Sequence, residues 1–405
     1  NPYLITSVVF LLFAGLVALD SALISFQILP WFNGLNWLRV HLITLGALTE
    51  ALFGILPALA ARRAGLKASL LQADRLRWDI WLALTVGLLV LLVGIPLMIY
   101  ALIVTGGTLI LIAALLLILH LRGMTPAASA PGKPAGAGRM FYLAGLAYLL
   151  FGIIVGSGLW FGWGNALGMA NPTEVHIHTN IWGFMSLVFA GLIVDLYSDW
   201  TGCALAWPRA VRPIFWMMTI GAFGAILGPW LAITPLMALG IVVHQVATAW
   251  LVVSIIKPLL GTEISKEPGI WHVITSYFWQ LAIVVVTPLI VLLRPGFSPA
   301  GLEQTAPQVL IYGWMLQFGY AVIPYLLRRA VSPQQEASLG GSWFSLVAVH
   351  AGGVFLAASI INGAYSAQFL GAAYLLWSFS FLPIARQLWQ ILNGAYDKPS
   401  IMKGT

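Results

Sequence analysis

The chain has 405 residues, of which 60% are apolar and only 8% are charged. Soluble domains carry about 25% charged residues, so the composition excludes an ordinary soluble protein. The single cysteine, Cys203, excludes an internal disulfide and a metal site built from cysteines.

Twelve apolar segments follow one another along the chain, each close to the length of about 20 residues that a helix needs to span a bilayer. Lipid requires backbone groups to be satisfied internally, which favours helices, whereas a β-barrel would show alternating segments of about ten residues. We therefore expect an all-α integral membrane protein that forms one polytopic domain over residues 1–405. The expected spans are 3–29, 36–61, 78–99, 101–121, 140–162, 175–197, 213–231, 233–256, 271–293, 306–327, 342–363 and 364–388.

The net charge of +7 could indicate a nucleic-acid partner, but the positions of the basic residues indicate a membrane topology instead. Of the 19 lysines and arginines, 17 follow the even-numbered segments, and only Arg39 and Arg294 lie on the other side. The positive-inside rule then places both termini in the cytoplasm. We expect a multi-pass protein of a prokaryotic cytoplasmic membrane, with the lipid bilayer and no nucleic acid as its partner.

The second, sixth and tenth segments resemble one another, which indicates an internal repeat. The aligned positions are His41, His178 and Gln308, followed five residues later by Gly46, Gly183 and Gly313. The separations of 137 and 130 residues each correspond to four helices. We therefore predict a pseudo-three-fold repeat of four-helix units, with the second helix of each unit lining a site. The units are expected at about 1–122, 140–257 and 271–390, with a flexible linker at 123–138.

Four of the seven histidines are expected well inside the membrane, where ionisable residues are functional candidates by default. At 1.5 Å per residue, His41 and His178 lie roughly 8 Å below the external surface and His244 roughly 15 Å. His350 lies near the middle of the eleventh segment, and a fifth histidine, His176, begins the sixth segment. The other two, His120 and His272, are expected at cytoplasmic helix ends, in contact with water.

The pair His176 and His178 has a spacing of two residues, which turns the side chains about 200° apart on a helix. The pair therefore cannot hold one metal from one helix face, which needs a spacing of three or four. The two side chains can instead serve two separate sites, one on each side of the helix. A haem between helices takes an axial imidazole from either side. The alternative is that His176 is interfacial and His178 bonds a neighbouring helix. The repeat favours His178 as the partner of His41.

Four further charged residues fit this hypothesis. Haem propionates need cations or water, and Arg39 lies one turn from His41, with Arg294 on the same side. Asp20 and Glu50 are carboxyl groups at mid-helix, where protonated or paired states are expected. They indicate a proton path, or alternatively structural hydrogen bonds.

The architecture resembles the haem–copper oxidase superfamily, which includes cytochrome c oxidase subunit I and the nitric oxide reductase large subunit. The run "HIHTNIWGFMSLVFAGLIVDLYSDWTG" at 176–202 and "HLITLG" at 41–46 also resemble motifs of the NnrS family of haem- and copper-containing membrane proteins, in reverse chain order. The resemblance implies one or two haem b groups bound by His41 and His178. It implies second-site metal ligands among His176, His244 and His350.

Two departures from the superfamily limit this implication. The seventh segment has no histidine, and the tenth carries Gln308 where a histidine would stand, so the usual copper site is not expected. The resemblance then implies a membrane oxidoreductase, or a subunit of one, active in electron transfer or in nitric oxide or oxygen chemistry. Its redox partner would be a cytochrome, a cupredoxin, a quinol or other respiratory subunits. The alternatives are a proton-coupled transporter and a structural subunit without a cofactor.

Overall fold

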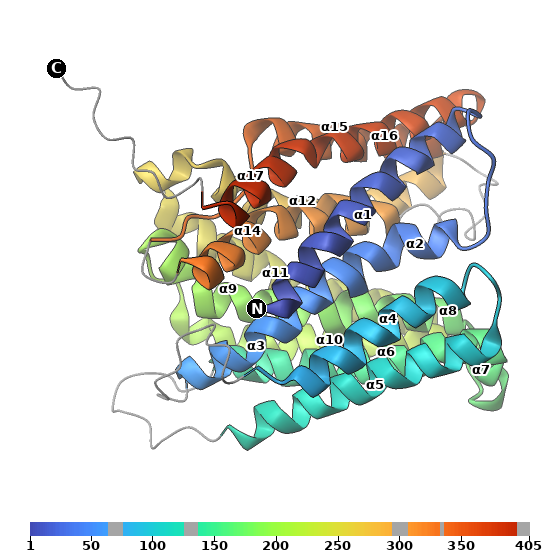
Figure 1. The fold of residues 1–405 in the computed structure, drawn as a ribbon, viewed down its shortest axis with the longest axis horizontal. Coiled ribbons are helices and arrows are strands. Elements are labelled where there is room, and N and C mark those ends of the chain that lie inside the picture. The colour runs from blue at the N-terminus through green and yellow to red at the C-terminus, as the bar shows by residue number, and fades with distance from the viewer. Residues whose placement is uncertain (64–75, 125–136, 294–306, 333–335, 395–405) are drawn as a thin grey trace.

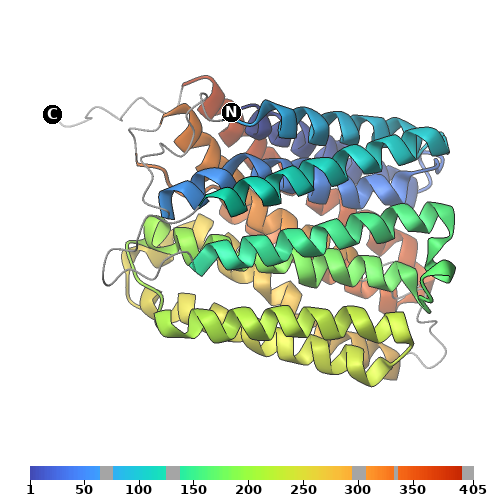
Figure 2. The same ribbon diagram turned by 90° about the horizontal axis from the view of Figure 1, so that it is seen from below.

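The protein is a bundle of roughly parallel helices, shown in Figure 1 and, turned by 90°, in Figure 2. The computed structural model describes residues 1–63, 76–124, 137–293, 307–332 and 336–394, and within these ranges every regular element is a helix. The all-α fold class predicted from the composition is therefore confirmed. Residues 125–136 of the predicted linker at 123–138 lie outside these ranges, and so does Arg294.

The helices follow one another along the chain in three groups. The first part of the chain forms α1 (Pro2–Ser25), α2 (Leu35–His41), η1 (Leu42–Thr49), α3 (Glu50–Arg63), α4 (Trp78–Gly94) and α5 (Tyr100–Gly123). The middle part forms α6 (Ala137–Phe161), α7 (Trp163–Ala166), α8 (Pro172–His178), η3 (Thr179–Met185), α9 (Ser186–Thr201), η4 (Pro208–Ala210), α10 (Val211–Leu231), α11 (Thr234–Ile256) and η5 (Lys257–Leu259). The last part forms η6 (Glu263–Lys266), α12 (Pro268–Leu293), η7 (Val309–Leu316), α14 (Gln317–Val331), α15 (Trp343–Ile361), η8 (Gly363–Tyr365), α16 (Ser366–Ser380) and α17 (Leu382–Leu392).

Ten spans of the described chain are long and apolar enough to cross a membrane. The apolar helix α4, with 17 residues, is shorter than the length of about 20 that crosses the hydrocarbon layer. Helix α12 has 26 residues, but the side chains of 286–293 are outside the described part. The structure is thus that of a multi-pass helical protein, with ten spans by length and hydropathy where the sequence predicts twelve.

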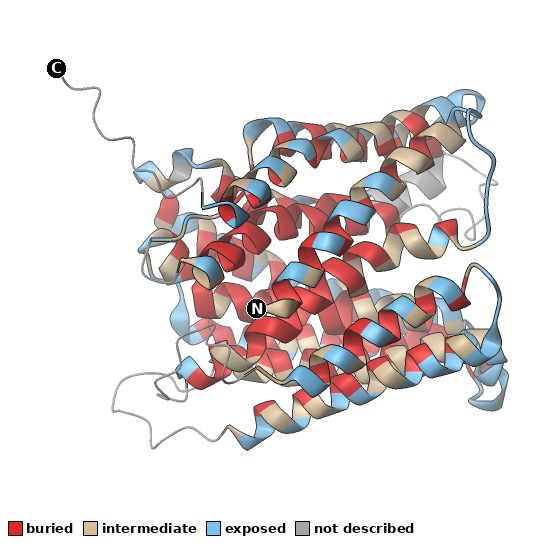
Figure 3. Cartoon of the chain, in the orientation of Figure 1, coloured by how far each residue is buried: buried red, intermediate tan, exposed pale blue. Residues whose placement is uncertain are grey.

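Three of these spans form the interior of the bundle. They are α2–η1–α3, α8–η3–α9 and η7–α14, and their most apolar stretches have 78%, 89% and 94% of their residues buried. The other seven spans have only 39–56% buried and present one side to the surroundings. Figure 3 shows this difference, with buried residues along α3, α9 and α14 and mixed colours on α4 and α5. The inner spans are therefore packed by protein on all sides.

Each inner span contains a π-helical stretch at the same place. The stretches η1, η3 and η7 begin directly after His41, His178 and Gln308. A π-helix is rare, usually covers a single turn and is frequent at functional sites. Three such stretches at aligned positions mark the end of the bundle where they lie as the place to look for a site.

A glycine in each π-helical stretch packs against an aromatic ring of the preceding long helix. A Cβ atom on Gly46 would lie 2.8 Å from Phe10, and one on Gly183 would lie 2.5 Å from Tyr148. A Cβ atom on Gly313 would lie 2.6 Å from Trp279. Small residues allow this close approach of helices, so the aligned glycines are explained by packing.

Candidate functional site

A cavity of about 520 Å³ lies between the inner spans, at the end of the bundle that carries α2 and α8 (right in Figure 1). All three inner spans line it, and α4, α5 and α6 complete the wall. Its lining is mostly aliphatic and aromatic. Among the described residues, the lining includes no Asp, Glu, Lys or Arg. The polar side chains of the lining are Asn36, His41, Thr44, Ser157, Thr173, His176, Asn180 and Gln308.

His41 and His176 are brought together in this cavity. Their ring centroids are 6.4 Å apart and their planes differ by 30°. The ring of Trp37 also stacks on His41, at 4.5 Å with an angle of 10°. The sequence favours His178 as the partner of His41, whereas in the structure His176 is the histidine that faces His41.

Main-chain carbonyls fix the hydrogen positions on both rings. The Nδ1 of His41 bonds to the carbonyl of Trp37 at 2.9 Å, and the Nδ1 of His176 bonds to the carbonyl of Gly152 at 2.9 Å. A carbonyl only accepts, so each Nδ1 carries the hydrogen and donates it. Each Nε2 then has a lone pair available, which is how a metal-binding histidine is normally oriented by its surroundings.

His178 points away from this cavity, toward α10. Its Nδ1 donates to the carbonyl of Ala225 at 2.8 Å. That carbonyl would normally accept from the residue four positions later, which is Pro229 inside α10 and has no N–H. The opposite directions of His176 and His178 confirm what their spacing predicts. The alignment of the repeats predicts how deep each histidine lies along its helix. It does not predict the direction of the ring, and for this reason it selected His178.

The two deeper histidines are not part of the cavity. His244 is completely buried, and its Nε2 lies 3.2 Å from the carbonyl of Trp182. His350 receives a hydrogen bond on Nδ1 from Trp279 Nε1 at 3.0 Å, and its Nε2 lies 2.9 Å from Thr275 Oγ1. Because a tryptophan only donates, both ring nitrogens of His350 are engaged. Among the described residues, this geometry therefore offers no second metal site around His350.

The described residues contain no group of three or more His, Cys, Asp or Glu side chains that could hold a metal ion. The cavity therefore offers a pair of ligands and not a complete cage.

The two histidines expected in contact with water differ from each other. His272 is completely buried, and its Nε2 donates to the carbonyl of Ser342 at 3.0 Å. His120 is half-buried near the end of α5. The expected contact of His272 with water is thus wrong, because the loop before α15 covers its ring.

Arg39 does not line the cavity. Its guanidinium is buried toward α1 and α16, where Nε donates to Ser21 Oγ at 2.7 Å. The Cζ atom lies 4.6 Å from the ring centroid of Tyr374. The expectation that Arg39 would face haem propionates is therefore not met, because the residues at i and i+2 of α2 point in opposite directions.

The two carboxyl groups of the predicted proton path also lie apart from the cavity. Glu50 follows η1 directly, is completely buried, and accepts a hydrogen bond from Thr85 Oγ1 at 2.7 Å. Its other oxygen, Oε2, has no partner among the residues the structure describes. Asp20 is half-buried on α1.

Gln308 is a site residue that sequence reasoning did not propose. It lines the cavity with the two histidines, is 6% exposed, and its Oε1 has no hydrogen-bond partner within the described chain. The signal that could have identified it is its alignment with His41 and His178. A buried carbonyl oxygen without a partner costs about 1–3 kcal/mol, so the Oε1 atom of Gln308 destabilises this part of the cavity wall.

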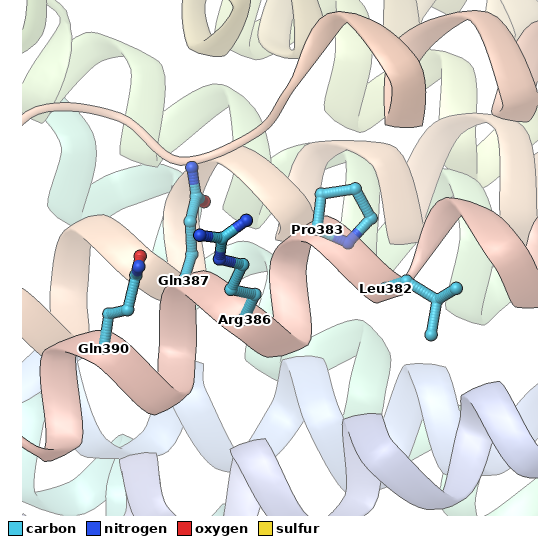
Figure 4. Close-up of a pocket in the computed structure, with 5 residues that line it drawn as sticks. All are labelled: Leu382, Pro383, Arg386, Gln387 and Gln390. Carbon is cyan, nitrogen blue, oxygen red and sulfur yellow. The ribbon is translucent and has the colours of Figure 1, made fainter.

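A second hollow, of about 550 Å³, lies along α17 and is drawn in Figure 4. Its labelled side chains are Leu382, Pro383, Arg386, Gln387 and Gln390. The Oε1 of Gln387 accepts a hydrogen bond from the N–H of Gly341, and its Nε2 donates to the carbonyl of Gly341, each at 3.1 Å. These five lining residues include no histidine or carboxylate, and we place no site there.

A comparison with models of known protein families gives no match, and a comparison with functionally curated proteins gives none either.

Proposed function

We propose that the protein is a haem b-binding membrane protein of the haem–copper oxidase type and that it transfers electrons. The observation that carries the proposal is the facing pair of imidazoles, His41 and His176, each held by a main-chain carbonyl at Nδ1. Imidazole is the common protein ligand of b-type haem iron, and bound haem supplies a one-electron carrier.

The separation of the two ring centres fits one iron between two imidazoles. A metal bound at about 2 Å from each of two imidazole nitrogens separates the ring centres by about 6 Å. The observed separation is 6.4 Å. The cavity volume of about 520 Å³ lies within the range of about 300–1,000 Å³ for cofactor sites, and its lining is apolar as such sites require.

The propionates of a haem would find no cation in the described lining. Two polar lining residues, Asn36 and Thr173, are exposed, and so is the apolar Leu159. The edge of the cavity that they form reaches the surface, where carboxylates can be hydrated. The polar edge and the apolar interior therefore match a cofactor with one charged side and one apolar side.

If His41 and His176 both hold one haem iron, no position is left for a gaseous ligand. This favours electron transfer over nitric oxide or oxygen chemistry at the site. We propose no copper centre, because His244 and His350 lie in separate hydrogen-bonded surroundings. For the electron donor we retain a cytochrome, a cupredoxin or a quinol, or another respiratory subunit.

We further propose that the chain crosses the membrane twelve times as three four-helix units. The three π-helical stretches at aligned positions support the repeat, as do the three glycines that each pack on an aromatic ring of the preceding helix. The distribution of basic residues supports cytoplasmic termini in a prokaryotic membrane. In this arrangement Glu50, and Asp20 nearer the external side, are proposed as members of a proton path.

An optical spectrum of the purified protein, expressed with haem available, tests the proposed function. We expect a Soret band in the wild type that His41→Ala and His176→Ala each abolish, while His178→Ala retains it. His176→Gly should regain the band when imidazole is added, because the ligand is then supplied in solution. A colourless wild-type protein would refute haem binding, and loss of the band in His178→Ala alone would refute the assigned pair.

A further inference from the structure

Arg39 is a buried cation without an acidic partner among the described residues. The residue is 7% exposed. Ion pairs in the described chain join Arg62 with Asp199, Arg77 with Asp79 and Lys266 with Glu263, and none of them includes Arg39. Its polar contacts are neutral: Nε donates to Ser21 Oγ at 2.7 Å, and Nη1 donates to Asn36 Oδ1 at 3.3 Å.

Aromatic rings occupy the place where a carboxylate would normally stand. The Cζ atom of Arg39 lies 4.6 Å from the ring centroid of Tyr374 and 5.4 Å from that of Trp31. Cation–π attraction holds a guanidinium in place but does not neutralise it. An arginine is not deprotonated in proteins, so this part of the interior carries a full positive charge.

This charge lies at the level of the candidate site without entering it. Arg39 and His41 are two residues apart on α2, which separates them by about 3 Å along the axis and by about 200° around it. Arg39 does not line the cavity itself, so it acts on the site through the field of its charge and through Asn36, a lining residue to which its Nη1 donates. Buried charges interact strongly because the interior has a low effective dielectric constant and excludes screening ions.

We propose that Arg39 sets the reduction potential of the iron held by His41 and His176. The inference rests on the proposed haem site. Loss of one electron takes ferrous iron to ferric iron and adds one positive charge to the site. The guanidinium opposes that added charge, so Arg39 favours the reduced form and raises the midpoint potential, which net charge and burial control in haem proteins generally.

A redox titration of the Soret band in the purified full-length protein tests this inference. Arg39→Gln removes the charge and keeps a hydrogen-bond donor for Ser21, so its midpoint potential should be lower than that of the wild type. Arg39→Lys keeps the charge and should remain near the wild-type value. Ser21→Asp places a carboxylate beside the unchanged arginine and should lower the potential as Arg39→Gln does.

Each outcome of this experiment decides the inference. Wild-type potentials in both Arg39→Gln and Ser21→Asp would overturn it. Equal shifts in Arg39→Gln and Arg39→Lys would also overturn it, because they would show that the shape of the side chain matters and its charge does not. If Arg39→Gln does not fold, the comparison of Ser21→Asp with Ser21→Ala gives the same test. A colourless wild-type protein refutes the haem site, whereas unchanged potentials in coloured variants refute only the role of Arg39.

Discussion

His41 and His176 face each other across the boundary between two inner spans, with ring centroids 6.4 Å apart. Each ring is oriented by a hydrogen bond from Nδ1 to a main-chain carbonyl, so the same nitrogen, Nε2, is left available on both. The carbonyl of Gly152 belongs to α6, whereas the carbonyl of Trp37 belongs to the same helix as His41. The pair is thus positioned by three separate helices. Support of this kind holds both rings rigidly, as a shared ligand site requires.

Carbon monoxide should not bind the reduced wild-type protein, because His41 and His176 would both hold the iron of the proposed haem and would leave it no free position. His176→Ala should open one position in any molecules that retain haem, and so should His176→Gly without added imidazole. The measurement is the change in the Soret spectrum of dithionite-reduced protein on addition of carbon monoxide. A full carbon monoxide spectrum in the wild type would contradict two-histidine ligation and would favour gas chemistry at this site.

The sequence predicted the helical membrane fold and the opposite directions of His176 and His178, because both follow from composition and helix geometry. It did not predict which of the two faces His41. Depth can be counted along a helix, but the direction of a ring depends on its neighbours, here the carbonyl of Ala225 that Pro229 leaves without its helical donor. Helix geometry alone predicts that Arg39 turns about 200° away from His41, whereas its contact with Tyr374 depends on packing between helices distant in sequence.

The glycines of the π-helical stretches should be required for stability. Gly183→Ala would bring a Cβ atom to 2.5 Å from Tyr148, and Gly313→Ala to 2.6 Å from Trp279, closer than packed atoms tolerate. Overpacking of this kind costs about 1–3 kcal/mol, so both variants should unfold at lower temperature in detergent. Gly123→Ala is the control, because a Cβ atom there meets nothing within 4 Å. An unchanged melting temperature for Gly183→Ala would contradict the close approach of η3 to α6.

Glu50 should be replaceable by glutamine but not by alanine. Glutamine keeps the shape of the side chain and the oxygen that accepts from Thr85 Oγ1, while alanine leaves a void and an unpaired hydroxyl in a fully buried place. A buried group that loses its partner costs about 1–3 kcal/mol. Thermal unfolding should therefore be near wild type in Glu50→Gln and clearly lowered in Glu50→Ala.

The role of Glu50 in a proton path requires a different measurement. If Glu50 exchanges a proton when the site is reduced, Glu50→Gln should weaken the pH dependence of the midpoint potential while the Soret band is unchanged. Thr85→Val, which removes the hydroxyl and keeps the carboxyl group, is the matched control and should retain that dependence. An identical pH dependence in Glu50→Gln and the wild type would leave Glu50 with a structural role only.

Gln308 should strengthen the binding of haem and lower the stability of the cofactor-free protein. Its side chain lines the cavity, and its Oε1 is buried without a hydrogen-bond partner in the described chain, a state that costs about 1–3 kcal/mol. Gln308→Met has a similar volume and no such oxygen, so the cofactor-free variant should melt at a higher temperature than the cofactor-free wild type. The same variant should lose haem faster to an acceptor protein, because a contact with the bound group is gone. Faster haem loss without a gain in cofactor-free stability would mean that methionine disturbs the shape of the cavity, and neither effect would mean that Gln308 does not contact the occupant.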